Sequence, residues 1–325
     1  MLTITHTPDA GTLIEGTSRG DGTAEILKAS GWRWGRTIAA WYVPQSRDRL
    51  PKWSTINRAA AALCAAGHEI TVDADESFRP AAEAEVAKIQ RQAARVDALD
   101  AKADRRAAQA DDADEAARRA LRRLPEGGEP IKIGHHSENH HRNAIAKADA
   151  AFGRSVEADR EATRARARAD IAAGTTETRY LPRTVAHRID RLDTDVRLLT
   201  RRIEGGSHNF GGGHIETTAP ATGARLDRLR TERAQRENER DYWSTVREAQ
   251  AAAGATAIHS RDTIAKGDAI EHKFGWSTVT RVNPKTVTVA LDWNGGTRPY
   301  SVAYADIRSH RVTADVAASA EAAAS

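Results

Sequence analysis

The chain of 325 residues is long enough for two or three domains, and its 49 Lys and Arg nearly balance its 45 Asp and Glu. A net charge of +4 on this length excludes a protein that binds nucleic acid through bulk charge alone. One cysteine, Cys64, excludes a disulfide framework. The sequence has no secretion signal and no run of about 18 apolar residues, so we expect a cytoplasmic protein without a membrane partner.

Residues 1–78 are predicted to form a small α+β domain, because large apolar residues are frequent there and turn residues separate short periodic segments. Gly31 and Gly67 each stand where a glycine commonly ends a helix. The elements expected in chain order are strands at residues 2–7 and 12–17, a helix at 23–29, a hairpin at 32–36 and 40–44, a helix at 49–66 and a strand at 68–75.

Residues 79–254 are predicted to form a helical region that pairs as a coiled coil, since apolar residues recur there every three or four positions. The first helix has an alanine-rich seam that is expected to contain Val86, Ile89, Ala93, Val96, Ala103, Ala107, Ala110 and Leu121. A second helix is expected over residues 137–172. Alanine seams are shallow, so we expect either close approach of the helices or a homo-oligomer to bury them.

The clearest heptads belong to a third helix, and a fourth helix follows a glycine-rich loop at residues 205–223. These two helices are expected to form an antiparallel hairpin. The apolar positions of the third helix are Val185, Ile189, Leu192, Val196, Leu199 and Ile203, and those of the fourth are Leu226, Leu229, Trp243 and Val246.

Residues 255–312 are predicted to form a small β-barrel. Segments 269–273, 276–282, 286–292 and 298–303 have strand character, and turn residues such as Asn283-Pro284-Lys285 separate them. Short strands at this spacing fit a small curled barrel. The Ala- and Ser-rich residues 313–325 are predicted to be a disordered tail.

The motif Gly134-His135-His136-Ser137-Glu138, followed by His141-Arg142, resembles the signature of a domain of unknown function found in actinobacterial plasmid, conjugative-element and phage genes. We call this domain, at about residues 131–254, the GHHS-type domain. Residues 242–243, 266–268 and 281–289 are similar to the region that follows it in such proteins, which ends in a small β-barrel. The resemblance implies a mobile-element setting and no established activity.

The GHHS motif offers a candidate metal site. Ser137 is a suitable N-cap, so we expect a helix to begin there with His136 and His140 one turn apart on one face. Two imidazoles at this spacing can share a divalent metal ion if a further ligand joins them. The candidates for that ligand are Glu138, His208 and His214. In the alternative interpretation, the motif starts a helix and its His and Arg residues contact a partner or a phosphate.

Two groups of residues are candidates for nucleic-acid binding, because aromatic rings beside basic side chains can stack bases and hold phosphates. The group in the N-terminal hairpin and the loop after it is Trp34, Arg36 and Arg47. The group in the predicted barrel is Trp276, Arg281 and Lys285. In both places the alternative is that the aromatic residues form the core of a small domain and the basic residues are its solvated surface.

No catalytic constellation stands out in the sequence. We therefore predict a non-enzymatic interaction or adaptor protein of a mobile element, whose partner is nucleic acid or another protein. The alternative is a metal-dependent hydrolase or nuclease in which His136 and His140 are ligands and Glu138 is a ligand or base. Apart from this divalent metal, the sequence predicts no cofactor.

Overall fold

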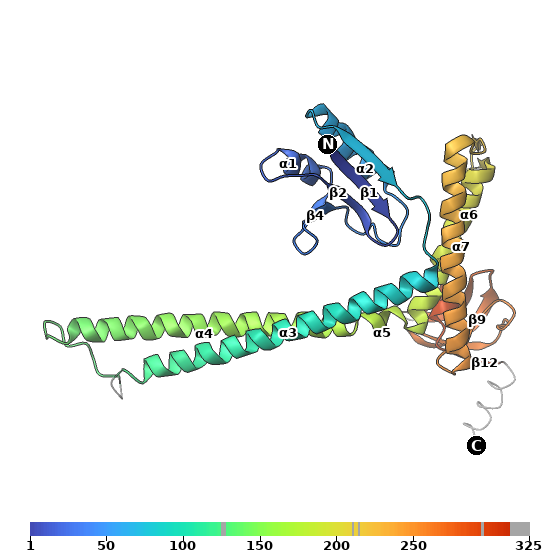
Figure 1. Cartoon of the computed structure of the whole chain (residues 1–325). Helices are drawn as coiled ribbons and strands as arrows, with labels where there is room; N and C mark the ends of the chain where they lie inside the picture. The colour runs from blue at the N-terminus through green and yellow to red at the C-terminus, as the bar shows by residue number, and fades with distance from the viewer. Residues whose placement is uncertain (125–127, 210, 214, 294–295, 313–325) are drawn as a thin grey trace, which may run out of the picture. The chain divides into compact units, whose positions relative to one another are not determined.

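The computed structural model of the chain describes residues 1–124, 128–209, 211–213, 215–293 and 296–312 (Figure 1). The chain divides into two compact units, residues 85–180 and residues 1–84 with 181–325. An N-terminal α/β region, a helical middle and a C-terminal antiparallel sheet follow one another along the chain, so the predicted order of parts is confirmed. The prediction for the tail at residues 313–325 lies outside the described residues.

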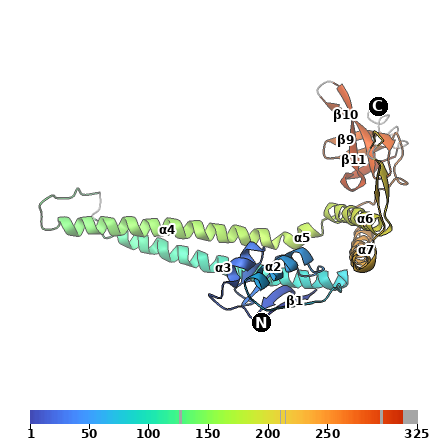
Figure 2. The ribbon, with the colours of Figure 1, turned by 90° about the horizontal axis from the view of Figure 1, so that it is seen from above.

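Two long helices, α3 (Ala81–Leu121) and α4 (Glu138–Ala173), lie side by side and are followed by the short helix α5 (Thr175–Arg179) (Figure 1, Figure 2). They are antiparallel, because Gln92 donates to the carbonyl of Ala172, whereas Arg106, further along α3, pairs with Glu161, which is earlier in α4. The fully buried residues of α4 recur at heptad spacing and are all alanine: Ala148, Ala151, Ala165, Ala169 and Ala172. Such small side chains let two helices approach closely.

The seam of α3 has a different phase from the one predicted. Val86, Ile89 and Leu121 are 55%, 39% and 49% exposed, and Ala93 and Ala107 are also exposed, so these assignments were wrong. Val96, Ala103 and Ala110 do lie on the buried or half-buried side. The residues of α3 that face the neighbouring helix were misassigned because the first of them are polar. A search for apolar residues at regular spacing does not find polar residues. The polar residues are Glu85, Lys88 and Gln92.

A buried ion pair closes the seam near the start of α3. The Glu85 carboxylate is 4% exposed and accepts two bonds from Arg179, from Nε at 2.8 Å and from Nη2 at 2.6 Å. Lys88 Nζ lies 3.1 Å from the same carboxylate. Burial alone would raise the pKa of Glu85, but the hydrogen bonds and charges of Arg179 and Lys88 outweigh burial and lower it.

Replacing Glu85 with Gln should destabilise the helical hairpin, because the carboxylate that pairs with Arg179 is lost. Removing one partner of a buried pair costs about 3–5 kcal/mol, and the partial exposure of Arg179 reduces the expected loss to about 2–3 kcal/mol. Because the folded-state pKa of Glu85 is lowered, this stabilisation is complete above the unfolded pKa of about 4.3. It is lost as the pH falls through the lower folded-state pKa.

Thermal melts followed by far-UV circular dichroism, at neutral pH and at a pH below the folded-state pKa of Glu85, measure this effect. The difference in midpoint between wild type and Glu85→Gln should be large at neutral pH and should vanish in acid. Glu83→Gln is the matched control, since Glu83 is an exposed carboxylate in the same turn. Equal effects of the two substitutions would contradict the assignment of Glu85.

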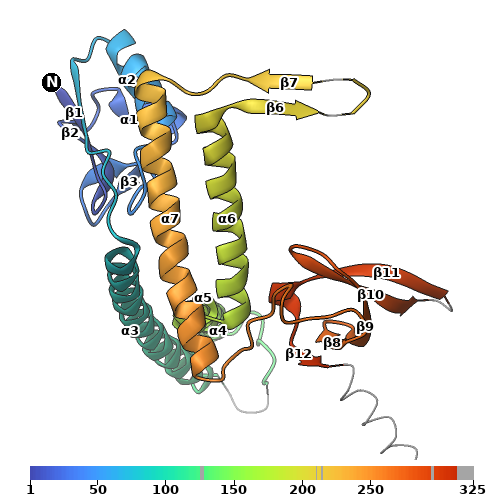
Figure 3. The ribbon, with the colours of Figure 1, turned by 90° about the vertical axis from the view of Figure 1, so that its right-hand side faces the viewer.

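The helices α6 (Pro182–Glu204) and α7 (Gly223–Ala252) form a second antiparallel pair (Figure 3). All six predicted heptad residues of α6 are buried or half-buried, and so are the four predicted apolar residues of α7, so this prediction is confirmed. Trp243 of α7 is 3% exposed and the Arg188 guanidinium lies 4.2 Å from its ring centroid. The buried side chains of α6 and α7 include Val185, Leu192, Leu199 and Trp243, which are larger than the alanines between α3 and α4.

The segment between α6 and α7 is not simply a loop, as the sequence predicted, but contains a two-stranded hairpin. The strands β6 (Gly206–Asn209) and β7 (Ile215–Thr218) pair antiparallel (Figure 3). Gly205 starts the hairpin with a φ of +71°, and a Cβ there would lie 2.5 Å from the carbonyl oxygen of Thr218. Only glycine can bring its backbone this close to the returning strand. The first glycine of the segment that was predicted as a loop therefore marks the point where α6 joins the hairpin.

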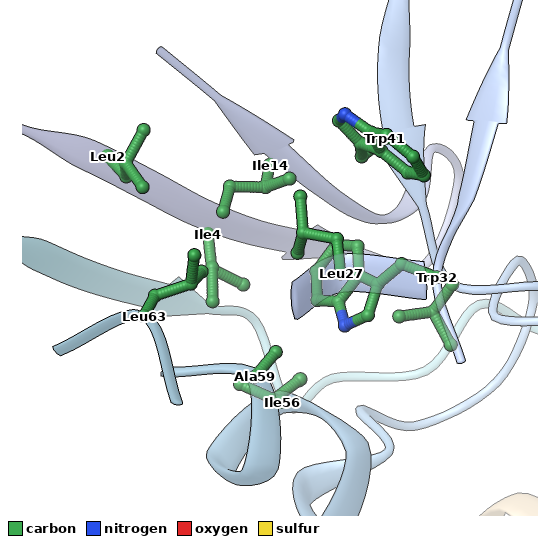
Figure 4. Packing of buried hydrophobic residues seen from close by; sticks show 10 residues of the cluster. Leu2, Ile4, Ile14, Leu27, Trp32, Trp41, Ile56, Ala59 and Leu63 are labelled. Carbon is green, nitrogen blue, oxygen red and sulfur yellow. The ribbon is translucent and has the colours of Figure 1, made fainter. Parts of the chain in front are cut away.

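The N-terminal domain is a five-stranded sheet in the order β3-β4-β2-β1-β5, with two helices packed on one face. Alternate strand residues point into that core: Leu2 and Ile4 from one strand and Ile14 from its neighbour meet Leu27, Ile56 and Leu63 of the helices (Figure 4). The elements are β1 (Leu2–Thr7), β2 (Gly11–Glu15), α1 (Thr23–Ala29), β3 (Arg33–Gly35), β4 (Ala40–Tyr42), α2 (Trp53–Ala65) and β5 (Ile70–Ala74). Every element predicted here is present, with ends that differ by a few residues.

The loop after β4 is fastened to the turn between β1 and β2. Ser46 Oγ accepts from the Thr12 amide at 2.8 Å and donates to the carbonyl of Val43 at 2.7 Å, and the Asp48 amide donates to the carbonyl of Pro8 at 2.7 Å. Gly11 has a φ of +80°, and a Cβ at this position would lie 2.5 Å from Ser46 Oγ. A side chain at position 11, the first residue of β2, would therefore collide with the docked loop.

Gly11→Ala should destabilise the N-terminal domain more than Gly20→Ala. Both glycines have a left-handed φ, at which alanine costs about 1–2 kcal/mol. A Cβ at Gly20 meets nothing within 4 Å, whereas at Gly11 it displaces Ser46, and the lost hydrogen bonds add about 1 kcal/mol each. Hydrogen-exchange mass spectrometry of residues 2–15 measures the difference. Equal protection in the two variants would show that the docked loop contributes nothing.

The C-terminal domain is an antiparallel sheet in the order β11-β10-β9-β8-β12. Its core contains Ile270, Val279, Val287, Val289 and Val302. The strands are β8 (Ala269–His272), β9 (Gly275–Val282), β10 (Thr286–Trp293), β11 (Gly296–Ala303) and β12 (Ser309–Arg311), with the 3-10 helix η1 (Tyr304–Asp306) before the last. No ladder joins β11 to β12 among the residues that the structure describes, so the sheet is open and the predicted closed barrel is not found.

Candidate nucleic-acid interface

The turn between β8 and β9 presents a cation above two aromatic rings. Lys273 Nζ lies 4.6 Å from the ring centroid of Phe274 and 5.4 Å from that of Tyr300. The two rings meet edge to face with centroids 5.5 Å apart. Phe274 is 49% exposed, although large apolar side chains are usually buried. The turn therefore exposes an aromatic face next to a positive charge.

His272 forms the base of this group. It is 1% exposed, its ring stacks on Tyr300 with centroids 5.9 Å apart, and Nε2 lies 3.1 Å from Ser277 Oγ. Burial and the nearby charges of Lys273 and Arg308 lower the pKa of His272. The imidazole is therefore neutral at pH 7 and supports the rings as a planar group, while the positive charge of the site comes from the lysine and arginine.

A second cation–aromatic pair involves the same hairpin but lies on the opposite face of the sheet, because Trp276 alternates with the core residue Val279 along β9, whereas Tyr300 packs on the core side. Trp276 is 43% exposed, and the Arg311 guanidinium lies 4.3 Å from its ring centroid. Arg311 comes from β12, two strands away from β9. It pairs with Ala269 of β8, whereas Trp276 pairs with Glu271 of the same strand, so the arginine reaches diagonally across β8 to the indole. We call Lys273, Phe274, Trp276, Tyr300 and Arg311 the hairpin cluster.

The structure does not bring the three predicted residues of this domain together. Trp276 is near the start of β9, whereas Arg281 is near its end and Lys285 lies in the following turn. Arg281 is five positions after Trp276 along the strand, a distance of about 17 Å. The sequence reasoning missed Lys273, Phe274 and Arg311. The signal for the first two was a Lys-Phe-Gly turn, but Arg311 could be found only from the order of the strands.

The structure also separates the three predicted residues of the N-terminal domain, Trp34, Arg36 and Arg47. Trp34 is 46% exposed and meets the buried Trp41 edge to face at 5.7 Å, because the two residues pair across β3 and β4. Arg47 lines a groove with Tyr42, on the face of the sheet opposite to the core. Arg36 is exposed just after β3. Trp32 is 2% exposed in the core, on the same side of the sheet as Trp41, with which Trp34 pairs.

The GHHS motif begins α4 as predicted, with Ser137 as the N-cap residue. The Ser137 side chain caps no helix amide but bonds to His135 Nδ1 at 2.7 Å. Glu138 accepts from the Gly134 amide at 2.7 Å and from Arg142 Nε, one turn later, at 2.9 Å. These two bonds lower the pKa of Glu138, with the amide of Gly134 as the larger cause. The carboxylate is thus already occupied.

Three or more possible ligands do not converge anywhere in the described part of the chain. The side chain of His208 and all of His214, two of the predicted ligands, lie outside the described residues. Binding of a divalent metal by His136 and His140 therefore stays a prediction.

If His136 and His140 bind a divalent metal ion, protein purified at neutral pH should contain about one ion per chain. The His140→Ala variant should contain none. Elemental analysis of both proteins measures this. His187→Ala is the control, since His187 is a half-exposed histidine that bonds to Asp306 at 3.1 Å and belongs to no predicted metal site. Metal-free wild-type protein would argue against the hydrolase alternative.

Residues 87–206 match the family described as "Domain of unknown function (DUF3560)". The matched residues contain the GHHS motif, so the prediction of a domain of unknown function in the helical region is confirmed. No curated protein and no solved structure is significantly similar to the chain. None of the helices in the described ranges combines the length and apolar character needed to cross a bilayer.

Proposed function

We propose that this protein is a non-enzymatic interaction protein of a mobile element that binds single-stranded nucleic acid through the hairpin cluster of its C-terminal sheet. The observation that carries the proposal is the pairing of exposed aromatic rings with cations at the β8–β9 hairpin. Phe274 and Trp276 offer ring faces, and Lys273 and Arg311 lie within 4.3 to 4.6 Å of them.

Single strands suit this geometry better than a duplex. Bases in a single strand can leave their neighbours and stack on an aromatic ring, and adjacent Lys and Arg side chains hold the phosphates between them. Residues 255–312 carry eight basic and five acidic residues, whereas residues 1–75 carry eight of each. The excess of positive charge therefore favours the C-terminal sheet over the N-terminal domain as the nucleic-acid contact.

The helices support a spacer role in this proposal. The heptad spacing of the alanines in α4 and of the apolar residues in α6 is typical of coiled-coil pairing. We propose that α3 and α4 pair as an antiparallel coiled coil. A second copy of the chain is the candidate partner for apolar residues that the seam leaves exposed, such as Val86 and Ile171.

Trp276→Ala and Phe274→Ala should each weaken binding of a short single-stranded oligonucleotide. Loss of one stacked base costs about 1–3 kcal/mol, which is about 5- to 150-fold in affinity. Arg311→Ala should lower the salt dependence of binding by about one phosphate contact. Fluorescence anisotropy over a series of salt concentrations, with single- and double-stranded DNA and with RNA, measures both effects.

Phe152→Ala is the matched control, since Phe152 is an exposed phenylalanine on α4 outside the cluster, with 59% of its surface accessible. It should bind as the wild type does. Absence of binding by the wild-type chain at low ionic strength would remove the nucleic-acid part of the proposal. Binding that Phe152→Ala weakens as much as Phe274→Ala would show that the cluster is not the contact.

A further inference from the structure

The N-terminal domain contains a groove that the C-terminal interface leaves unexplained. The groove encloses about 350 Å³, which is within the usual range of about 300–1,000 Å³ for small-ligand sites. It lies on the outer face of the sheet. Leu13 and Tyr42 pair across β2 and β4 and line the groove, whereas their neighbours Ile14 and Trp41 pair on the core side.

The apolar wall of the groove depends on Gly35. A Cβ on Gly35 would lie 2.6 Å from Ile38 Cγ1 and 3.3 Å from Tyr42 Cδ1. The missing side chain therefore lets Ile38, which is 44% exposed, fold back over β3 beside the tyrosine ring. Together with Leu13, these side chains make a flat, partly exposed apolar surface that can cover one face of a planar ligand.

The opposite rim is polar and its backbone is held in an uncommon conformation. Gln45 and Asp48 have φ values of 56° and 55°, and Ala39 at the tip of the β3–β4 hairpin has 49°. Such residues cost about 1–3 kcal/mol each and persist where surrounding contacts fix them. Here the two hydrogen bonds of Ser46 and the Asp48–Pro8 bond fix the loop. The Gln45 amide at the rim is thereby presented on an ordered backbone.

Arg47 completes the rim. Its Nε donates to the carbonyl of Ala10 at 3.1 Å, and this bond orients the exposed guanidinium beside the groove. Among the contacts of the described residues, the guanidinium bonds only through Nε, so four N–H donors on the terminal nitrogens face solvent. A guanidinium in this position matches the geometry of a phosphate.

We infer that this groove binds one nucleotide, with the base against Tyr42, Ile38 and Leu13 and the phosphate at Arg47. Three features would recognise such a ligand. They are a planar apolar wall, an amide that can bond to a base edge, and a guanidinium for the phosphate. The nucleotide is either free or part of a single strand. The inference concerns a different domain from the hairpin cluster and does not rest on the function proposed for that cluster.

Isothermal titration of the full chain with adenosine 5′-monophosphate, adenosine and inorganic phosphate tests the inference. The monophosphate should bind at one saturable site, more tightly than adenosine or phosphate alone. Arg47→Ala should weaken binding of the monophosphate by about tenfold to a hundredfold, since a charge-assisted hydrogen-bond pair is lost. Arg58→Ala, which removes an exposed arginine from α2 on the core side of the sheet, should leave binding unchanged.

A second readout uses the wild-type chain, because Arg47→Ala also removes the bond to Ala10. In methyl NMR spectra, the resonances of Leu13 and Ile38 should shift on addition of the monophosphate. The titration is repeated with oligoadenylate in a chain that carries Phe274→Ala and Trp276→Ala. Tighter binding of the oligonucleotide with the same methyl shifts identifies a strand as the source, and weaker binding identifies a free nucleotide.

Three results would overturn the inference. They are the absence of saturable binding by the wild-type chain, equal effects of Arg47→Ala and Arg58→Ala, and binding of the monophosphate without any shift at Leu13 and Ile38. Loss of oligonucleotide binding in the Phe274→Ala, Trp276→Ala chain with retained binding of the monophosphate would separate this groove from the C-terminal interface.

Discussion

The scarcity of large apolar side chains in the helical region is the constraint on which the architecture depends. Alanine buries little area, so a seam of alanines between α3 and α4 supplies only a small hydrophobic contribution per turn. The hairpin compensates with charged side chains that reach across the seam, as in Arg106–Glu161 and the Arg166 bonds to Asp100 and Asp104. One such pair, Glu85–Arg179, is buried.

The same constraint bears on where the candidate surfaces lie. The larger apolar and aromatic residues are concentrated in the two sheet-containing parts of the chain. In both sheets, some large apolar or aromatic side chains are not needed to fill the core. Phe274 and Trp276 remain outside the C-terminal core, and Ile38 and Tyr42 remain outside the N-terminal core. In both places a basic side chain lies beside the exposed rings.

Local sequence signals were sufficient for most elements. The heptads of α6 and the turn residues of the N-terminal domain each acted within a few positions, and the helices and strands they predicted are present. Errors arose where a distant partner decides the outcome. Glu85 holds a seam position because Arg179, 94 residues later, pairs with it, and apolar periodicity chose Val86 instead. Gly205 marked a hairpin junction, because its close contact is with Thr218 on the returning strand.

In the candidate sites too, the sequence indicated local features but not the contacts between residues that are distant along the chain. The sequence indicated aromatic and basic residues in segments where the structure places rings beside cations, but it grouped them by their spacing along the chain. Trp276 was predicted with Arg281, on the same strand, yet its cation comes from β12. Strand order is set by non-local pairing, so no count of residues from Trp276 leads to Arg311. Likewise, Trp34 and Arg47 were grouped together, although the pairing of β3, β4 and β2 places them on opposite faces of the sheet.

The ion pairs that join the two sides of the α3–α4 hairpin differ in burial, so dissolved salt affects the two ends of the hairpin differently. Arg106 and Glu161 are 41% and 42% exposed, and Arg166 and its two partners are between 44% and 73% exposed, so dissolved salt weakens these contacts. The buried Glu85–Arg179 pair is shielded from ions. In concentrated salt, the free energy of opening therefore falls first in the turns of α3 and α4 nearest their connection, and amide protons there exchange before those beside Glu85. Ionic strength thus sets how far the two helices separate while their other ends stay together.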